Sequence, residues 1–405
     1  MTTRSFNNKK PRKPFYQSHY RKPGSFGLGR RNHMGGNRKT IDFTKFVNKA
    51  IQTNEAEAYV VQHRFADFKI DHRIFSTIES KGYETPTPIQ DRIIPCIIDG
   101  SDVVGIADTG TGKTAAFLLP LINKILQNQR EKVLIITPTR ELAIQIESEF
   151  KQFARGMGIF SVCCVGGMNI GRQISALYRN YNLIVGTPGR IKDLTERKKI
   201  NLSLFSSVVL DEADRMFDMG FIKDTRLIMN KLPRVRQTLF FSATLSNDIE
   251  RIINEFTNNP VRVSLKTRDT SKNVEQDVIR VNNGKTKLEI LNELLAQKEF
   301  NKVLIFGRTK HGVEKLSRSL YSSGFKAESI HGNKNNSQRQ KALGMFKDNR
   351  VNILVATDVA ARGIDIADIS HVINYDVPAT YEDYIHRIGR TGRCNKKGIA
   401  LTFID

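Results

Sequence analysis

A glycine-rich segment in the first third of the chain has the residue types needed to hold a nucleotide triphosphate. It reads Ala107-Asp108-Thr109-Gly110-Thr111-Gly112-Lys113-Thr114 and lies between an apolar run and a helical pattern. Glycines let backbone N–H groups surround a phosphate, a helix start adds positive potential, and a lysine reaches the β- and γ-phosphate oxygens. The hydroxyl of Thr114 is a ligand that suits Mg²⁺. The segment predicts a phosphate loop, although the general pattern has Gly where Ala107 stands.

About one hundred residues later the chain carries the acids that such a loop needs. The run Asp211-Glu212-Ala213-Asp214 follows the apolar Val208-Val209-Leu210. In a phosphate-loop enzyme, Asp211 would hold Mg²⁺, partly through water, and Glu212 would polarise the water that attacks the γ-phosphate. Asp214 taken alone is better explained as an acidic cap of the following helix. The two halves, in this order, predict one nucleotide-hydrolysing site.

These groups require strands that end at a common edge. From about residue 60 onward, short β-branched runs that end at Gly, Pro or Asp alternate with helix-period segments, which is typical of βα units around a parallel sheet. The strands predicted in the first half are 102–107, 132–137, 161–165, 182–185, 207–210 and 238–241. Those predicted in the second half are 278–281, 302–306, 327–330, 352–356, 371–375 and 398–403.

The alternation of strand and helix segments predicts an α/β protein with two parallel-sheet domains in tandem. We expect a disordered basic arm over residues 1–60, a first domain over 61–265, a linker over 266–276 and a second domain over 277–405. Ligands of open parallel sheets bind beyond the carboxyl ends of the strands, and a cleft between two such domains can open and close around one.

The net charge indicates a polyanionic partner. The chain has 405 residues, with 64 Lys and Arg against 41 Asp and Glu, a formal charge of +23. The first forty residues hold eleven of the basic side chains and no acid, interspersed with Phe and Tyr. Such an arm can attract phosphates and stack on unpaired bases, while a solvated tail without a specific partner is the alternative. It lacks the apolar face of an organelle transit peptide.

Membrane and disulfide classes are disfavoured by composition. No apolar run approaches the roughly 20 residues that span a bilayer. Four cysteines, Cys96, Cys163, Cys164 and Cys394, form no C-x-x-C pair, which favours reduced thiols. We therefore expect a cytoplasmic protein that does not engage a membrane.

Residues 211–214 together with the phosphate loop resemble the DEAD-box RNA helicases of helicase superfamily 2, a family that accepts Ala at position 107. The resemblance runs from about Phe65 to Asp405 and includes nearly every motif in order. It implies two RecA-like domains, ATP and Mg²⁺ as cofactors, and RNA as partner, both as single strand and as short duplex. Nothing in this core predicts a stable oligomer, so we expect a monomer.

Upstream, Phe65 and the segment from Gly82 to Gln90 resemble the adenine-reading Q motif of that family. The resemblance implies that Phe65 stacks on the base and that Gln90 bonds its edge. An amide is a bidentate partner for adenine N6 and N7, which agrees with ATP selectivity. Without the resemblance, Phe65 is better read as a core residue.

Short segments between the phosphate loop and the acids resemble the RNA-gripping motifs of the family. Hydroxyls, helix N-termini, glycine backbone and arginine suit phosphate and 2′-hydroxyl oxygens without reading bases. The residues assigned to RNA by this resemblance are Pro138, Thr139, Arg140, Gly166, Gly167, Thr187, Gly189, Arg190 and, in the second domain, Thr357. Ser242 and Thr244 resemble the segment that couples the nucleotide to domain closure, although their hydroxyls could serve only a cap or turn.

Two segments in the second half of the chain, residues 356–365 and 386–393, resemble the last two motifs of the family. There Asp365 would contact the ATP ribose, Arg390 and Arg393 would act as arginine fingers on the γ-phosphate, and His386 would link this motif to the first domain. The chain departs from the family at Asn333 and Asn336, where Asp and Gln are usual. We expect this departure to alter closure energetics or the grip on RNA without abolishing the chemistry.

The function predicted from these residues is RNA-stimulated ATP hydrolysis that closes two domains and separates short RNA duplexes locally, with little sequence preference. Two alternative functions would use the same ATP-hydrolysing domains: an ATP-gated RNA clamp with little unwinding, and a DNA-directed translocase. The RNA bound, the pathway and the protein partners do not follow from the sequence.

Overall fold

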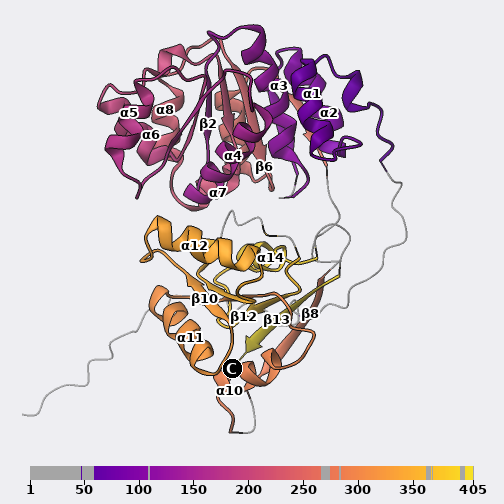
Figure 1. Ribbon diagram of the computed structural model, residues 1–405, viewed down its shortest axis with the longest axis vertical. Coiled ribbons are helices and arrows are strands. Elements are labelled where there is room, and N and C mark those ends of the chain that lie inside the picture. The colour runs from indigo at the N-terminus through magenta and orange to yellow at the C-terminus, as the bar shows by residue number, and fades with distance from the viewer. Residues whose placement is uncertain are drawn as a thin grey trace, which may run out of the picture. The chain divides into compact units, whose positions relative to one another are not determined.

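The computed structural model describes residues 47, 59–107, 110–265, 274–281, 284–361, 366, 368–392 and 397–404 of the chain. Within these residues the strands form two separate sheets, one of seven strands and one of six. Every strand pair in both sheets is parallel. Figure 1 shows the first sheet with its helices in purple and pink and the second in orange and yellow.

The first sheet is built from short, almost wholly buried strands. In spatial order they are β3 (Ser161–Cys164), β4 (Leu183–Gly186), β2 (Val133–Ile136), β5 (Ser207–Leu210), β6 (Gln237–Ser242), β1 (Val103–Ile106) and β7 (Val261–Ser264). Apolar side chains lie on both faces, as expected for a parallel sheet covered by helices on each side. Thus Val103 belongs to the core on one face and Val104 to the core on the other.

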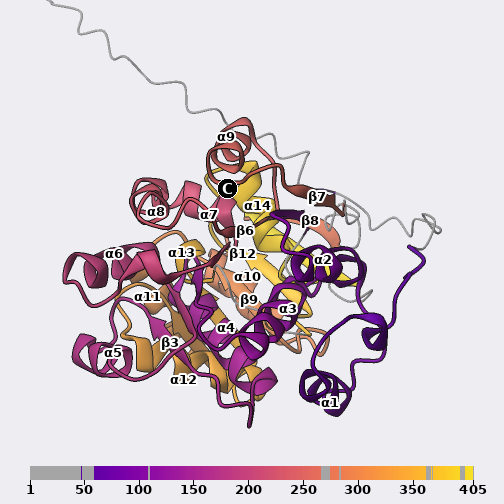
Figure 2. The ribbon, with the colours of Figure 1, turned by 90° about the horizontal axis from the view of Figure 1, so that it is seen from above.

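Nine helices among the described residues cover the two faces of this sheet, and the views from the side and from above agree on the division (Figures 1 and 2). One face packs against α1 (His72–Ser80), α2 (Pro88–Ile98), α3 (Lys113–Gln127) and α4 (Arg140–Phe153). The other packs against α5 (Ile170–Leu177), α6 (Pro188–Glu196), α7 (Ala213–Asp218), α8 (Ile222–Met229) and α9 (Asn247–Phe256). Two single turns of 3₁₀ helix, η2 (Phe65–Asp67) and η3 (Leu202–Leu204), complete the domain.

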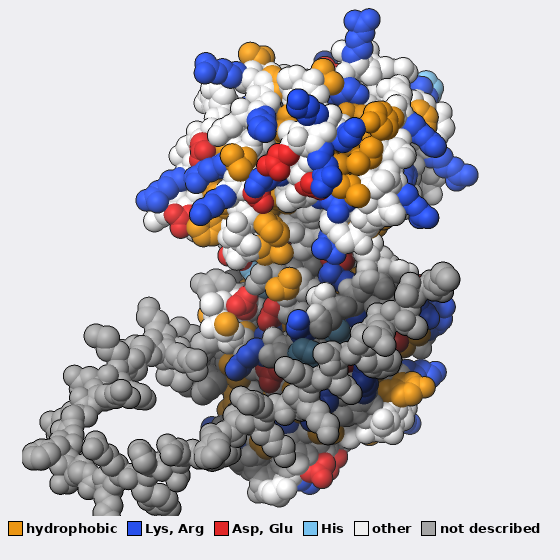
Figure 3. Space-filling model, turned by 90° about the vertical axis from the view of Figure 1, so that its left-hand side faces the viewer, with side chains coloured by type: hydrophobic (Ala, Val, Ile, Leu, Met, Phe, Trp, Pro, Cys, Tyr) orange, Lys and Arg blue, Asp and Glu red, His pale blue; other side chains and the backbone are white. Residues whose placement is uncertain are grey.

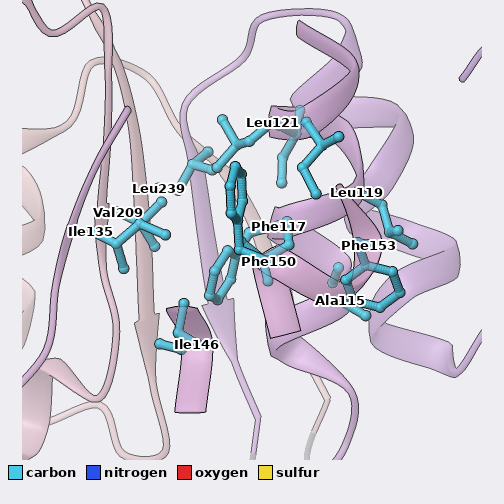
Figure 4. Close-up of a cluster of buried hydrophobic side chains, with 14 of the residues drawn as sticks. Ala115, Phe117, Leu119, Leu121, Ile135, Ile146, Phe150, Phe153, Val209 and Leu239 are labelled. Carbon is cyan, nitrogen blue, oxygen red and sulfur yellow. The ribbon is translucent and has the colours of Figure 1, made fainter. Parts of the chain in front are cut away.

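Aromatic and aliphatic side chains of α3 and α4 fill the space over the sheet. Phe117 and Phe150 lie against Ile135, Val209 and Leu239 of three neighbouring strands (Figure 4). All five are essentially inaccessible to solvent. Burying such side chains contributes roughly 1.5–3 kcal/mol each. This core fixes the start of α3, and therefore the loop that precedes it.

The second sheet has the strand order β10 (Ala327–Ile330), β11 (Ile353–Ala356), β9 (Val303–Phe306), β12 (His371–Asn374), β13 (Gly398–Ile404) and β8 (Val274–Arg280). Helices α10 (Lys287–Leu295) and α11 (Lys310–Ser322) pack on one face. Helices α12 (Asn336–Lys347), α13 (Asp358–Ala361) and α14 (Tyr381–Ile388) supply the cores on the other. None of the helices that the structure describes has the length and apolar character needed to cross a bilayer.

The predicted α/β fold with two parallel sheets is confirmed, and each predicted strand is present. One strand, β7, was not predicted, because its residues Val261–Ser264 include Arg262 and it lies at the sheet edge. β8 begins at Val274, within the range predicted as a linker, 266–276. Gln276 lies in this strand and is buried. Its burial is tolerated because its amide oxygen accepts a hydrogen bond from Tyr384 Oη at 3.0 Å. The domain boundaries stay predictions, and the basic arm lies outside the described residues apart from Val47, Tyr59 and Val60.

Gly186 allows the close approach of β3 and β4, and we predict that Gly186→Ala destabilises the first domain. It pairs with Cys164, and an added Cβ would overlap the carbonyl oxygen of that residue. Backbone cannot move aside cheaply, so we expect the free energy of unfolding to fall by roughly 1–3 kcal/mol. Urea unfolding followed by circular dichroism measures this. Gly189→Ala, which meets nothing within 4 Å, is the control and should stay within about 0.5 kcal/mol of the parent. Equal unfolding midpoints for both variants would contradict the prediction.

Candidate active site

The phosphate loop lies between β1 and α3, as its sequence predicts. Gly112 is the residue before α3 and has a φ of +92°, and Gly110 has a φ of +86°, conformations that favour glycine. The Lys113 side chain is buried, and its Nζ donates a hydrogen bond to the Ala107 carbonyl at 2.6 Å. Thr111 and Thr114 complete the described part of the turn. Asp108 and Thr109 lie outside the described residues.

The two acids expected to act on the nucleotide follow β5 directly. Asp211 is buried, and this burial raises its pKa to about 7, opposed by the positive charge of Lys113 and reinforced by the charge of Glu212. Glu212 has left-handed backbone, with φ +53°, a costly conformation for a residue other than glycine. Its Oε2 accepts a bond from Arg215 Nη1 at 2.6 Å, in a pair buried on both sides. The backbone turn and the arginine together orient the Glu212 carboxylate.

Asp214 joins this acidic segment to the end of β6. Its Oδ2 accepts hydrogen bonds from the backbone N–H of Ala243 and of Thr244, each at 3.1 Å, and from Thr244 Oγ1 at 3.3 Å. Ser242 Oγ donates to the Thr244 carbonyl at 2.8 Å, which closes the turn. A helix-capping role alone therefore does not describe Asp214, because its side chain also connects the acidic segment after β5 to the turn after β6. Ser242 and Thr244 are placed beside the acids, where a coupling segment needs to lie.

Gln90 connects the segment before α2 to the phosphate loop. Its Oε1 accepts from the Thr87 backbone N–H at 2.9 Å, and its Nε2 donates to the Gly112 carbonyl at 3.1 Å. A Cβ at Gly112 would lie 2.6 Å from Gln90 Nε2, so glycine is required for this contact. The amide thus holds the loop before any ligand is bound.

Phe65, the residue expected to stack on a base, does not line the cavity beside the phosphate loop. Its ring is buried, lies edge-on to Phe68 and is stacked on Tyr83 with ring centres 6.4 Å apart. Tyr83 is partly exposed and lines the nucleotide cavity in place of Phe65. Phe65 therefore occupies a core position, as the alternative interpretation expects. The aromatic ring that lines the cavity is that of Tyr83. On the first domain that cavity is lined by Tyr83, Gln90, Gly110, Gly112, Lys113, Thr114, Asp211 and Glu212.

The segments expected to grip RNA gather where β2, β3 and β4 end. Thr139 is the cap of α4, where its Oγ1 accepts from the Leu142 N–H at 3.3 Å, and Thr187 precedes α6. The guanidinium of Arg140 packs over Gly166 and Gly167, with no room there for a Cβ at Gly167.

A second arginine reaches the same turn from α6. Arg190 Nη1 lies 3.5 Å from the Met168 carbonyl, so arginines from α4 and α6 approach it together. Pro138 lies in the loop before α4, and Gly189 lies in the first turn of α6. The structure therefore brings these predicted residues together at one edge of the sheet.

In the second domain the expected residues surround the carboxyl ends of β11 and β12. Thr357 follows β11, and its carbonyl accepts from the N–H groups of Ala360 and Ala361. His386 and Arg390 line a small pocket, with Arg390 Nε donating to the His386 carbonyl at 3.3 Å. Asp365 and Arg393, assigned to the ribose and to the second finger, lie outside the described residues.

Sequence reasoning missed a buried arginine that organises this second site. Arg387 donates to both oxygens of Asp358, at 2.5 and 2.7 Å, and to the Asn374 side chain and the Asp376 carbonyl. It ties the start of α13 to α14. The sequence holds three arginines in this motif, and only the hydrogen bonds in the structure identify Arg387 as the one that binds Asp358 and Asn374. For Asn336, the residue that departs from the family, the side-chain oxygen is buried with no hydrogen-bond partner in the described part of the chain.

The residues of the first domain fit a nucleotide with a divalent cation. Glycines with positive φ, a helix start and a buried lysine face the same cavity. Asp211 is a buried carboxyl that forms no ion pair within the described residues, and a cation beside it would offset the cost of its charge. Hydroxyl and carboxylate oxygens of Thr114 and Asp211 are donors that suit Mg²⁺.

Comparison with known proteins gives two matches to family models. The model described as DEAD/DEAH box helicase matches residues 87–252, and the model described as helicase conserved C-terminal domain matches residues 286–395. Among curated proteins, the ATP-dependent RNA helicase CshA of Listeria monocytogenes is 44% identical over 344 residues, which are 84% of this chain and 66% of that protein. The chain therefore spans slightly less than two thirds of the length of this relative.

Solved structures extend the comparison to both domains. The crystal structure of a DEAD box protein from Methanococcus jannaschii is 40% identical with a TM-score of 0.50, and the match covers 84% of this chain and 93% of that one. The structure of S. cerevisiae Dbp5 bound to RNA and ADP BeF3 is 29% identical with a TM-score of 0.75, covering 84% and 89%. The two sheets are thus RecA-like domains, and the chain belongs to the DEAD-box helicase family.

We predict that Gln90→Glu weakens ATP binding about tenfold, a loss of about 1.4 kcal/mol. The carboxylate keeps an acceptor for the Thr87 N–H but loses the donor to the Gly112 carbonyl and places a negative charge against it. Titration with a fluorescent ATP analogue measures the dissociation constant. Gln152→Glu, an exposed position on α4, adds the same charge and serves as control. Unchanged affinity for Gln90→Glu would show that the bridge does not support the loop.

Proposed function

We propose that this protein is an ATP-dependent RNA helicase, in which RNA-stimulated hydrolysis drives closure of the two domains and local separation of short RNA duplexes. Family membership supports the class, and the names of the curated relatives and the RNA in the Dbp5 structure support RNA as the substrate. The observation that carries the proposal is the connection from the acid segment through Asp214 to Thr244, which joins the nucleotide residues to a loop outside the cavity.

The chemistry proposed for the first domain follows from its charges. The ammonium of Lys113 would neutralise the β- and γ-phosphate oxygens, while N–H groups of the loop through Gly110 and Gly112 would surround them. Mg²⁺, when bound, supplies further neutralisation of the phosphates, and Thr114 together with Asp211 would hold it, partly through water. Glu212, oriented by Arg215, would accept the proton of the attacking water. Thr109 and Gln90 would complete the contacts to the nucleotide.

The second domain would supply the groups that respond to closure. Arg390 and Arg393 would neutralise charge on the transferring phosphoryl group only when the domains meet. Asp365 would contact the ribose, and His386 would link this motif to the first domain. Product release would then reopen the cleft, as in other enzymes whose cycle depends on closure.

RNA would be held by its backbone. Arg140, the Gly166-Gly167 turn and Arg190 present guanidinium groups and backbone at one edge of the first sheet, and Thr357 does so in the second domain. Such groups suit phosphates and 2′-hydroxyls and carry no base readout, so the separation should be largely independent of sequence. A monomer in the cytoplasm, with protein partners unassigned, stays a prediction from the sequence.

We predict that Asp214→Asn lowers strand release and leaves ATP binding intact. An amide has one acceptor oxygen in place of two, so the donors of Ala243, Thr244 and Arg215 can no longer all be satisfied. Hydrogen bonds to a charged group contribute roughly 1.5–3 kcal/mol, so release of a short RNA duplex should fall at least about tenfold while ATP binding is retained. Gel-based strand release and nucleotide titration give the two readouts. Asp248→Asn, exposed on α9, is the control, and equal strand release by both variants would refute the role of Asp214.

The proposed function is tested by ATP hydrolysis without nucleic acid, with single-stranded RNA and with DNA of the same sequence. We expect RNA to stimulate turnover more than DNA does. Lys113→Ala should lower the stimulated rate at least about 100-fold, because the positive charge at the phosphates is lost. Stimulation by DNA alone would favour the translocase, ATP-dependent RNA retention without strand release would favour the clamp, and retained hydrolysis by Lys113→Ala would show that the phosphate loop is misassigned.

A further inference from the structure

The loops that precede the strands of the first sheet form a surface on the side opposite the nucleotide residues. We call it the amino edge, and it comprises residues 99–102, 128–132, 154–160, 178–182, 197–206, 230–236 and 257–260. These loops contain ten Lys and Arg and three acidic residues. Figure 3 shows that Lys and Arg predominate over Asp and Glu on the visible face of this domain. The basic residues of the amino edge are Arg130, Lys132, Arg155, Arg179, Arg197, Lys198, Lys199, Lys231, Arg234 and Arg236.

The amino edge is continuous, because backbone hydrogen bonds connect one loop to the next. The Asn182 N–H donates to the Phe160 carbonyl at 2.9 Å, and the Val133 N–H donates to the Asn182 carbonyl at 2.9 Å. From there the Ser206 N–H donates to the Lys132 carbonyl at 3.1 Å, and the Gln237 N–H donates to the Ser206 carbonyl at 2.9 Å. The basic residues thus lie along one strip that crosses the sheet.

The three acids of the amino edge leave it strongly positive, and only Asp99 is an exposed carboxylate without an ion pair among the described residues. Asp102 is buried, where it accepts bonds from the N–H groups of Thr238 and Asn258, each at 2.7 Å, and Glu131 accepts from the Ser206 hydroxyl. Arg197 pairs with Asp193 of α6. Within the described part of the chain the other nine basic residues form no ion pair with a carboxylate. The surface therefore presents uncompensated positive charge.

Two aromatic rings lie exposed among these charges. Tyr178 is 74% exposed and Phe160 is 57% exposed, so both rings are accessible to a ligand. Lys199 Nζ donates to Tyr178 Oη at 2.7 Å, which holds the phenol beside a cation. Basic residues that track a backbone and aromatic rings that stack on bases are the two components of non-specific single-strand binding. An acidic protein surface would satisfy the charges but would give the rings no planar partner.

We propose that the amino edge is a second binding surface for single-stranded RNA, contacted by RNA that extends from the segments around Arg140 and Gly167. This inference rests on the proposed function. β3 is the edge strand, and its four residues separate the two surfaces by about 13 Å at 3.3 Å per residue. An RNA held at the carboxyl end of β3 passes around this strand to reach Phe160 and Tyr178. The second surface raises affinity for long RNA without entering the chemistry.

The test uses the full chain and two labelled oligouridylates, one of about 5 nucleotides, near the lower limit for a single binding site, and one of about 40. The variant reverses three exposed charges of the amino edge, Arg155→Glu, Arg179→Glu and Lys198→Glu. A matched control reverses three exposed charges of the second domain, Lys298→Glu, Lys315→Glu and Lys326→Glu. Binding is measured by anisotropy over a range of salt concentrations, and hydrolysis is measured at saturating RNA and ATP.

We expect the amino-edge variant to bind the long RNA about tenfold more weakly than the control variant, with a salt slope reduced by about 2, the value for three lost phosphate contacts on a single strand. Binding of the short RNA and the saturated hydrolysis rate should match the control. Tyr178→Ala should weaken long-RNA binding with an unchanged salt slope, and Tyr178→Phe should restore it, because stacking needs only the ring.

Equal long-RNA affinity and salt slope in the amino-edge and control variants would overturn the inference while leaving the proposed function intact. Displacement of the long RNA from the amino edge by polyglutamate, together with no effect of Tyr178→Ala, would assign the surface to an acidic protein. Absence of RNA-stimulated hydrolysis in the parent chain would instead defeat the proposed function, whatever the variants do.

Discussion

The parallel pairing of the strands is the constraint on which the site depends. Because every carboxyl end lies at the same edge, loops far apart in the sequence become neighbours there. The order of the first sheet then sorts them. β5, β6 and β1 are adjacent and precede the acids, the coupling turn and the phosphate loop, while β3, β4 and β2 precede the segments assigned to RNA. One sheet therefore places the residues assigned to the nucleotide and those assigned to RNA side by side without mixing them.

Most of this arrangement could be predicted from residue types. Apolar runs that stop at Gly, Pro or Asp mark buried strands, and the predicted strand 207–210 coincides with β5. Elements at the margins were harder to predict. β7 carries Arg262, and the start of β8 alternates buried and exposed residues, so neither has a continuous apolar run. Their membership of a sheet depends on neighbours that a local pattern does not contain.

The site residues divide in the same way. Glycines, Lys113 and the acids of 211–214 are recognisable because the chemistry dictates both type and spacing. Burial cannot be recognised from residue type and spacing in this way. Phe65 and Tyr83 are both aromatic residues near Gln90, and only the fold determines which of the two rings is buried. Arg387 and Arg390 are three residues apart in one motif, yet Arg387 holds Asp358 and Asn374 inside its domain. Roles that arise from tertiary packing require the structure.

Helix dipoles account for only part of the charge at the amino edge. Cations at helix C-termini gain about 0.3–1 kcal/mol, but the effect is confined to the helix end. Five of the ten basic residues, Arg155, Arg179, Arg197, Lys198 and Lys231, lie within two residues of the end of a helix. Lys132, Arg234 and Arg236 lie five or more residues beyond the preceding helix, where that gain has decayed. Dipoles also give no reason to expose Tyr178 and Phe160. A polyanion with planar bases accounts for the charges and the rings together.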